Sequence, residues 1–327
     1  MIKTIKHFKG GSLSSTCLLE DGGKLFVRKS VSLVHNREYG FQRWYSQLKK
    51  LQKYSIMFPG LFPSVLNYGM TDNNAYFDME FFKDAINAHQ YINECNSQKK
   101  VDTFFKSLIN AIDILHKKKF DSSKNSMDLY IHEEIDQRLK DCYKEEFFLD
   151  FLDYKKIIFN GKEINSFVES LSLYRDMLNK HFNENSEIFS HGNMTLENIL
   201  YIPQTDKVIF IDPYEENIID SELAEYSQLL QSSNSKYEIY CSKKAIINEN
   251  NISLKINESF GINYFNNILL RYLENKFNHD QYMVIRLLEV SQFIRMLPFK
   301  MNVDKSKMIF FYGLASFLFD SIKADAK

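Results

Sequence analysis

A short stretch in the second half of the chain most constrains how this sequence can fold. Two runs of β-branched and aromatic residues, ILYI at 199–202 and VIFI at 208–211, flank the polar segment PQTD at 203–206, and this pattern predicts a β-hairpin. In an antiparallel hairpin the residue before the first strand lies beside the residue after the second. Here these residues are Asn198 and Asp212. Amide and carboxylate oxygens suit Mg²⁺, which commonly keeps substrate phosphates among its ligands. The stretch therefore predicts a magnesium site.

The N-terminal region contains weaker signals for phosphate binding. Residues near 6–29 are predicted to form a β-hairpin or part of a small sheet, because apolar runs at 17–19 and 25–27 flank an Asp-Gly-Gly turn. A strand lysine, Lys29, and a helix glutamate, Glu38, follow, and such a pair can form an ion pair that aims the lysine at phosphates. Small residues precede the hairpin, and their main-chain amides can surround an anion; the candidates are Gly10, Gly11, Ser12, Ser14 and Ser15.

The remaining pattern predicts a sheet-rich lobe followed by a helical lobe. Residues 61–69 and 75–82 are predicted as strands, and helical periodicity prevails afterwards. The helical pattern is interrupted at 157–163, where Asn160-Gly161 predicts a turn. We expect an α+β fold with an N-terminal nucleotide-binding lobe at 1–84 and a helical catalytic and substrate lobe at 85–327. A nucleotide base is expected to bond to the main chain near Glu80 and Phe82, where the two lobes meet.

Composition excludes some partners and leaves others open. The 327 residues suit two lobes, and a net charge of −1 gives no electrostatic reason to expect a nucleic acid. No run reaches the roughly 18 apolar residues that span a bilayer. The four cysteines form no CxxC pair, which favours free thiols in a reducing compartment. We therefore expect a cytoplasmic protein, whose oligomeric state the sequence leaves open.

The order of these signals resembles a known family. The segment HGNMTLEN at 191–198 is similar to the H-G-D-x-x-x-x-N loop of the aminoglycoside phosphotransferase and choline kinase group, within the protein-kinase-like superfamily. The family's metal-binding aspartate stands here as Asp212, in the segment IDPY that ends at Tyr214. The IDP form and the downstream stretch 220–240 look closest to bacterial phosphotransferases of surface-polysaccharide synthesis, and the resemblance covers roughly residues 5–240.

The resemblance implies a bilobal kinase-like fold that uses ATP or GTP with Mg²⁺. Lys29 would hold the α- and β-phosphates, and Glu38 would orient it. Asn198 and Asp212 would bind the metal ion. The expected acceptor is a hydroxyl of a small molecule, either a sugar-like precursor of a surface polysaccharide or an amino alcohol such as choline. His191 is expected to be a structural member of the loop.

One position departs from the family pattern. Asn193 stands where the family has its catalytic aspartate, and a neutral amide cannot accept the proton of the substrate hydroxyl. One interpretation is a pseudokinase that binds nucleotide in a regulatory role, or a kinase-like protein that transfers AMP instead. The other is a kinase whose base has been exchanged for its amide isostere. Retention of Lys29, Glu38, Asn198 and Asp212 favours the second interpretation.

Acidic residues outside this loop are predicted to be solvated. The triplet HEE at 132–134 lacks the second histidine of an HExxH zinc motif, which indicates an exposed helix face. Six acids and no Lys or Arg lie between Lys207 and Lys236, and they could bind a cationic acceptor. We favour the simpler interpretation, in which Asp220 caps a helix and Glu222 and Glu225 line its exposed first turns. The other acids in that stretch are Asp212, Glu215 and Glu216.

Overall fold

The computed structural model describes residues 2–8, 14–34, 39–121, 126–183, 186–214, 216–301 and 304–325. The chain divides into two compact units, which are not continuous in sequence. The first unit comprises Met1–Tyr91, Thr103–Leu115 and His191–Asn217, and the second comprises Ile92–Asp102, His116–Ser190 and Ile218–Lys327.

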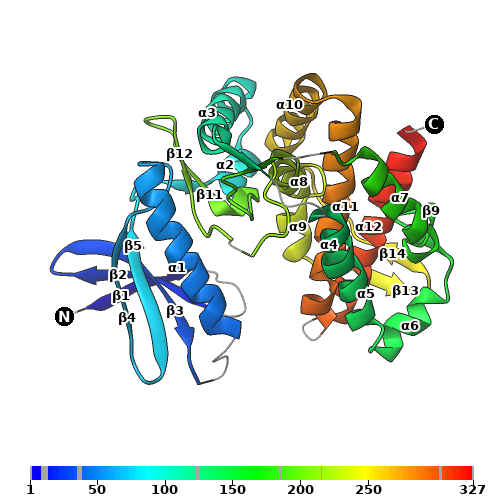
Figure 1. Ribbon diagram of the computed structural model, residues 1–327, viewed down its shortest axis with the longest axis horizontal. Helices are drawn as coiled ribbons and strands as arrows, with labels where there is room; N and C mark the ends of the chain where they lie inside the picture. The colour runs from blue at the N-terminus through cyan, green and yellow to red at the C-terminus, as the bar shows by residue number, and fades with distance from the viewer. Residues whose placement is uncertain are drawn as a thin grey trace. The chain divides into compact units, whose positions relative to one another are not determined.

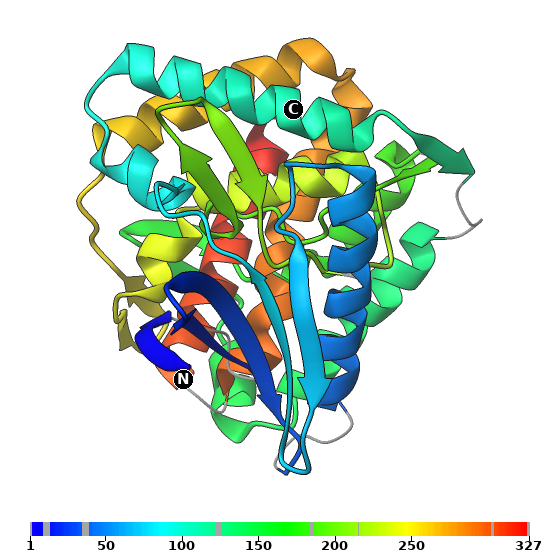
Figure 2. The same ribbon diagram turned by 90° about the vertical axis from the view of Figure 1, so that its left-hand side faces the viewer.

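A five-stranded antiparallel sheet in the order β1-β2-β3-β5-β4 forms the base of the first unit (Figure 2). The central strand β3 alternates in burial, and its Val27, Lys29 and Val31 face the buried side. Gly22 and Gly23 both have positive φ and make the turn between β2 and β3, as the sequence predicted. The strand bounds are Lys3–Phe8 (β1), Ser15–Asp21 (β2), Lys24–Ser32 (β3), Val65–Met70 (β4) and Asn74–Glu80 (β5).

Helix α1, Tyr39–Met57, packs against this sheet (Figure 1). Its buried face includes Trp44, Leu48 and Leu51, at the spacing of three and four residues that the sequence shows. The Trp44 ring lies 6.1 Å from the ring of Phe77 on β5, centroid to centroid. The helix is therefore fixed to the same face of the sheet that carries Lys29, because Phe77 is the register partner of Lys29.

The predicted hairpin is present in the first unit. Strands β11, Ile199–Ile202, and β12, Lys207–Phe210, pair in an antiparallel manner, and the short strand β6, Ile86–Asn87, adds to β11. Helices α2, Ala88–Glu94, and α3, Gln98–His116, cover this small sheet through Tyr91 and Phe104, whose rings lie within 5.0 Å of the ring of Tyr201. The turn at 203–206 also lies where the sequence predicted it.

The second unit consists mainly of helices. The long helix α11 packs against α8 and α12 and buries residues on all sides, from Met283 to Leu297. The helices are Ser126–Tyr130 (α4), Gln137–Cys142 (α5), Glu146–Leu152 (α6), Leu171–His181 (α7), Glu222–Ser233 (α8), Tyr237–Cys241 (α9), Phe260–Lys276 (α10), His279–Met301 (α11) and Lys305–Asp325 (α12), with a π-helix at Ile131–Asp136 and 3₁₀ turns at Val168–Ser170 and Leu196–Asn198.

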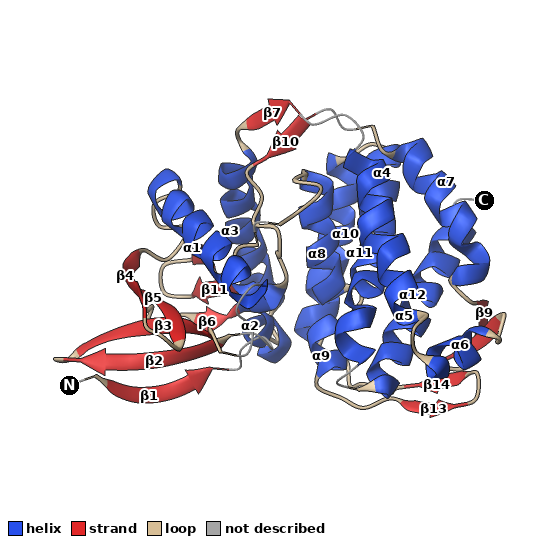
Figure 3. Ribbon diagram, turned by 60° about the horizontal axis from the view of Figure 1, so that its bottom comes forward, coloured by secondary structure: helices blue, strands red, loops and turns tan. Residues whose placement is uncertain are grey.

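Two small sheets complete the second unit. A four-stranded sheet in the order β13-β14-β8-β9 lies against α12 (Figure 3). The turn between β8 and β9 contains Asn160 and Gly161, both with positive φ, as predicted. The strands are Lys156–Phe159 (β8), Lys162–Asn165 (β9), Ile246–Asn248 (β13) and Asn251–Ser253 (β14), while Lys119–Asp121 (β7) pairs with Ser186–Ile188 (β10).

The antiparallel sheet of the first unit and the helices of the second confirm the predicted α+β fold class. The expected lobe limits of 1–84 and 85–327 stay a prediction. Among the described residues, no helix is both long and apolar enough to cross a membrane.

Candidate active site

The register of the β11–β12 hairpin corrects one detail of the sequence prediction. Ile199 pairs with Phe210, and the N–H of Ile211 donates to the carbonyl oxygen of Asn198 over 2.9 Å. Asn198 therefore lies opposite Ile211, and Asp212 lies one residue beyond it. The chain leaves the strand direction at Asp212, whose φ is +54°, a conformation that Asp tolerates better than most residues.

His191 holds the loop together through both ring nitrogens. Nε2 donates to the carbonyl oxygen of Ile211 over 2.8 Å, and Nδ1 accepts from the N–H of Asn193 over 3.2 Å. One neutral tautomer, protonated at Nε2, satisfies both contacts. The ring is fully buried and stacks on Phe62, with centroids 6.2 Å apart. His191 is therefore a structural member of the loop, as the sequence predicted, and has no proton acceptor to offer a substrate.

Gly192 is required by a close approach of two main-chain segments. Its φ is +83°, and a Cβ there would lie 2.5 Å from the carbonyl oxygen of Tyr214 and 2.1 Å from Nδ2 of Asn217. Both distances are far below van der Waals contact. The N–H of Tyr214 also donates to the carbonyl oxygen of His191 over 2.8 Å. The loop before β11 and the segment after β12 are thus in direct contact.

Asn193 is fixed by its main chain rather than by its side chain. Its carbonyl oxygen accepts from Nδ2 of Asn198 over 2.8 Å and from the N–H of Thr195 over 2.9 Å. Within the described ranges, no hydrogen bond is made to its half-buried side-chain amide. Nothing in this loop's own structure therefore demands an amide at position 193. Asn198, which holds the loop, is itself buried.

Lys29 and Asp212 form an ion pair that joins β3 to the end of the hairpin. Nζ of Lys29 lies 2.9 Å from Oδ1 of Asp212, although the two residues are 183 positions apart. The side chain of Lys29 is 11% exposed and that of Asp212 39% exposed. The lysine is therefore the more buried partner of the pair, and its charge is balanced by the more accessible carboxylate.

Helix α1 anchors the segment after Asp212, which the sequence analysis missed. Nζ of Lys50 donates to the carbonyl oxygen of Tyr214, Nε2 of Gln47 donates to that of Pro213 over 3.3 Å, and the guanidinium of Arg43 lies 5.1 Å from the ring centroid of Tyr214. These helix residues recur at i, i+4 and i+7, which puts them on one face. That polar stripe was the signal in the sequence.

Several predicted nucleotide-binding residues lie outside the described residues, namely Gly10, Gly11, Ser12 and Glu38. Of the described ones, Ser15 is exposed at the start of β2 and Ser14 is half-buried before it. The N–H of Glu80 donates to the carbonyl oxygen of Ser64, and the N–H of Ala85 donates to that of Phe82. A base bound near this segment would have to use its other main-chain groups.

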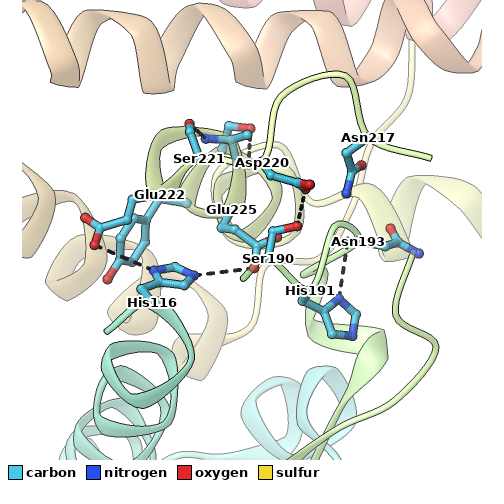
Figure 4. Close-up of polar contacts among 12 residues, drawn as sticks. His116, Ser190, His191, Asn193, Asn217, Asp220, Ser221, Glu222 and Glu225 are labelled. Carbon is cyan, nitrogen blue, oxygen red and sulfur yellow. Dashed lines mark hydrogen bonds and ion pairs between the residues drawn. The ribbon is translucent and has the colours of Figure 1, made fainter. Parts of the chain in front are cut away.

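Glu222 and Glu225 do not line an exposed helix face as predicted (Figure 4), whereas Glu216 is exposed and Glu215 lies outside the described residues. Glu225 is buried, and its Oε2 lies 3.5 Å from Nε2 of His116, while Oε1 of Glu222 lies 3.9 Å from Nδ1 of the same ring. Neither ring nitrogen of His116 makes a hydrogen bond within the described part of the chain. Nζ of Lys276 lies 3.9 Å from Oε2 of Glu222. The cluster lies within the second unit and contains charges of both signs.

The start of α8 also differs from the prediction. Oγ of Ser221, not the side chain of Asp220, accepts from the N–H of Ala224 and caps the helix. The carboxylate of Asp220 instead accepts from Oγ of Ser190, as Figure 4 shows. Glu134 was predicted to be exposed as well; it is buried, and its Oε2 lies 2.8 Å from Nε of Arg295.

The donor set near Lys29 fits a metal ion only if a substrate completes it. In the described ranges, no group of three or more His, Cys, Asp or Glu side chains is placed to hold a metal. Asn198 and Asp212 contribute oxygen atoms of the kind that Mg²⁺ prefers, and Mg²⁺ commonly binds through one or two such groups with phosphates and water supplying the rest. The residues therefore fit magnesium delivered with a nucleotide.

Comparisons with known proteins identify the fold. No family model and no curated protein matches the chain. The structure is similar to the crystal structure of a putative fructosamine-3-kinase from Haemophilus somnus 129PT, with a TM-score of 0.56 and 13% sequence identity over 97% of this chain and 92% of that one. The chain thus has a protein-kinase-like fold. At this identity, the likeness extends to the fold alone.

Proposed function

We propose that this protein binds Mg-ATP, or Mg-GTP, in its first unit and transfers phosphate to a hydroxyl of a small molecule. The observation that carries the proposal is the ion pair between Lys29 and Asp212, at 2.9 Å. A buried strand lysine and the acidic residue after a hairpin, brought together from distant parts of the chain on a kinase-like fold, form a phosphate-handling arrangement.

In this proposal Lys29 binds the α- and β-phosphates. The ion pair holds the ammonium group in place before nucleotide binds, so little side-chain entropy is lost on binding. The small residues Gly10, Gly11, Ser12, Ser14 and Ser15 would surround the phosphates with main-chain amides, and Glu38 would orient Lys29.

Asn198 and Asp212 would hold Mg²⁺ together with the phosphates. The metal supplies charge neutralisation to the transferring group. The rest of the rate enhancement would come from positioning of the reacting groups. His191 and Gly192 support this positioning because they fix the loop against residues 211–214. Arg43, Gln47 and Lys50 on α1 support the same segment from the other side.

The amide at position 193 limits the chemistry of the chain. Asn193 cannot accept the acceptor's proton, and His191 is not available as a substitute because both ring nitrogens are engaged. We therefore expect slow transfer from this chain and faster transfer from Asn193→Asp. Because no contact of the described residues requires the amide side chain, the substitution should leave the loop intact.

The same residue supports a second candidate, a pseudokinase that binds nucleotide without transferring phosphate and acts as a regulatory partner. In that case Asn193→Asp alone would not restore turnover. A third outcome, transfer of AMP, would reveal itself by release of pyrophosphate rather than ADP.

For the acceptor we propose a neutral sugar or a sugar-like precursor of a surface polysaccharide. The resemblance of the loop to that group of phosphotransferases supports this choice. Two acids of the second unit support this choice too. Glu225 is buried and the carboxylate of Asp220 accepts a hydrogen bond from Ser190, so neither is an exposed carboxylate suited to a cationic acceptor. An amino alcohol such as choline remains the alternative acceptor.

The test is product analysis with the wild-type chain and Asn193→Asp, using Mg-ATP and a panel of hexoses, choline, ethanolamine and a fructosamine. The proposal predicts ADP that depends on an acceptor, and about 10²-fold more of it from Asn193→Asp, the lower range for a general base. ADP from neither protein with any acceptor would leave the pseudokinase as the better account.

A further inference from the structure

Four polar side chains form a row across the sheet of the first unit. The strand registers pair His7 with Cys17, Cys17 with Arg28, and Arg28 with Asp78. Residues paired directly across neighbouring strands project from the same face of a sheet. Lys29 follows Arg28 in β3 and therefore projects from the opposite face. The row lies on the face turned away from the proposed phosphate site.

Cys17 is hydrogen-bonded to an imidazole in this row. Its Sγ lies 3.1 Å from Nδ1 of His7 and 3.6 Å from Oγ of Ser15. Cys17 is only partly buried and His7 is exposed, so the pair lies at the surface of the sheet rather than in the core. A thiol beside an imidazole has a proton acceptor at hand, and the thiolate is the nucleophilic form of cysteine.

Arg28 forms the other neighbour of Cys17 in the row. Its guanidinium makes two hydrogen bonds to Asp78, at 2.6 and 2.8 Å, and lies 4.0 Å from the ring centroid of Tyr76. The hydrogen bond to Asp78 raises the pKa of Arg28 above its ordinary value. Arg28 is thus a positively charged side chain on the strand next to Cys17, and its charge is balanced by the carboxylate of Asp78.

The other cysteines have different surroundings. Cys142 is fully buried, and burial raises the pKa of its thiol to about 12. Cys95 is buried, and its Sγ donates to the carbonyl oxygen of Ser97. Cys241 is partly buried, and it serves as the matched control because its accessibility is in the same class as that of Cys17.

We propose that Cys17 and His7 form a thiol–imidazole pair that makes Cys17 a site of exchange with low-molecular-weight disulfides. Nδ1 of His7 accepts the thiol proton, and the Cys17 sulfur attacks one sulfur of the disulfide RS–SR. A new S–S bond forms on Cys17, the RS–SR bond breaks, and the departing RS⁻ takes the proton from the imidazolium of His7. The product is a mixed disulfide on the outer face of the sheet, and a thiol reverses the step.

The Cys17–His7 pair does not involve Lys29, Asp212 or Asn198. Of the residues proposed to surround the phosphates, Ser15 contacts the row, through its Oγ 3.6 Å from Sγ of Cys17. The first unit would then have a second chemistry, in which the ratio of small disulfides to thiols determines how much Cys17 is modified on the sheet that also carries Lys29.

The test uses the full chain with glutathione disulfide as the probe, at pH 7 under native conditions, with intact-protein mass spectrometry for the rate and peptide mapping for the position. The wild-type chain is expected to gain one adduct, at Cys17. Cys17→Ser should lose it, while Cys241→Ser should keep it. His7→Gln removes the base from an exposed position and should slow the adduct's formation roughly tenfold.

Equal reactivity of Cys17 and Cys241 would overturn the proposal, and so would an unchanged rate in His7→Gln. Thermal melting of His7→Gln that matches the wild-type chain shows that a slower rate comes from lost chemistry. If His7→Gln melts lower than the wild-type chain, the rate of glutathione adduct formation at the fully buried Cys142 reports on unfolding. A Cys142 adduct in that variant would mean that unfolding, not the imidazole, controls the reaction, and it would overturn the assignment.

Discussion

Replacement of Gly192 by alanine tests whether the loop before β11 and the segment after β12 are in contact as described. Two costs are expected. An L-residue with side chain at a φ of +83° costs about 1–2 kcal/mol. In addition, the new Cβ would lie 2.5 Å from the carbonyl oxygen of Tyr214, so that carbonyl must move and lose the hydrogen bonds that it accepts from Lys50 and Asn217. At about 1 kcal/mol each, these add about 2 kcal/mol.

A matched control separates the two costs. Gly23 has nearly the same φ, +81°, lies in the same unit, and has no atom within 4 Å of a new Cβ. Gly23→Ala should therefore lower the free energy of unfolding by only the backbone cost of about 1–2 kcal/mol. Gly192→Ala should lower it by about 2 kcal/mol more.

The assay is urea unfolding followed by tryptophan fluorescence. Trp44 is the single tryptophan of the chain, is buried on α1 and belongs to the first unit, so its signal reports on the unit that contains both glycines. Unfolding is expected to be cooperative within this unit, and its midpoint gives the difference in stability. Equal destabilisation by the two substitutions would refute the close approach at Gly192.

Two further predictions concern the second unit. Burial alone would raise the pKa of Glu134, but Arg295 and Arg138 lower it below its usual value; the pairing should therefore stabilise the protein above about pH 4.3, the unfolded value, and this contribution should be lost as the pH falls through the lower folded pKa. Glu134→Gln should cost on the order of 3 kcal/mol at pH 7. The difference in unfolding free energy from wild type, followed by circular dichroism, should narrow as the pH falls below the unfolded pKa of Glu134; a difference that is constant from pH 3 to 7 would contradict the pairing. Ser221→Ala should cost about 1 kcal/mol in the same assay because it removes the cap of α8, whereas Ser97→Ala should cost less because Ser97 makes no side-chain cap bond to α3, and equal losses would count against the Ser221 cap.

The sequence predicted the elements whose signals are local. The β11–β12 hairpin, the Gly22–Gly23 turn and the Asn160–Gly161 turn follow from short patterns that need no distant partner. The structural role of His191 could likewise be inferred, since its loop is continuous in sequence. Lys29 and Asp212 were each predicted from local signals of this kind. Their ion pair is the long-range contact that brings the two predicted segments together in the candidate site.

The errors arose where distant residues decide the outcome. Glu134 and Glu225 were assigned to exposed helix faces because their burial depends on Arg295 and His116, which lie more than 100 positions away. The Ser221 cap could not be distinguished from Asp220 because both residues are good caps. The parallel pairing of β14 with β8 joins segments that have no shared pattern, and the offset of Asp212 from Asn198 depends on where β12 ends.

The most direct test of the central claim is thermal unfolding of the wild-type chain with and without Mg-ATP, beside Lys29→Met and Lys24→Met. Lys24 begins the same strand but is exposed, so its substitution controls for loss of a positive charge. We predict stabilisation of the wild type and Lys24→Met by about 2.7 kcal/mol at a hundredfold excess over the dissociation constant, and none of Lys29→Met. Absence of stabilisation in the wild type, or its persistence in Lys29→Met, would contradict the account.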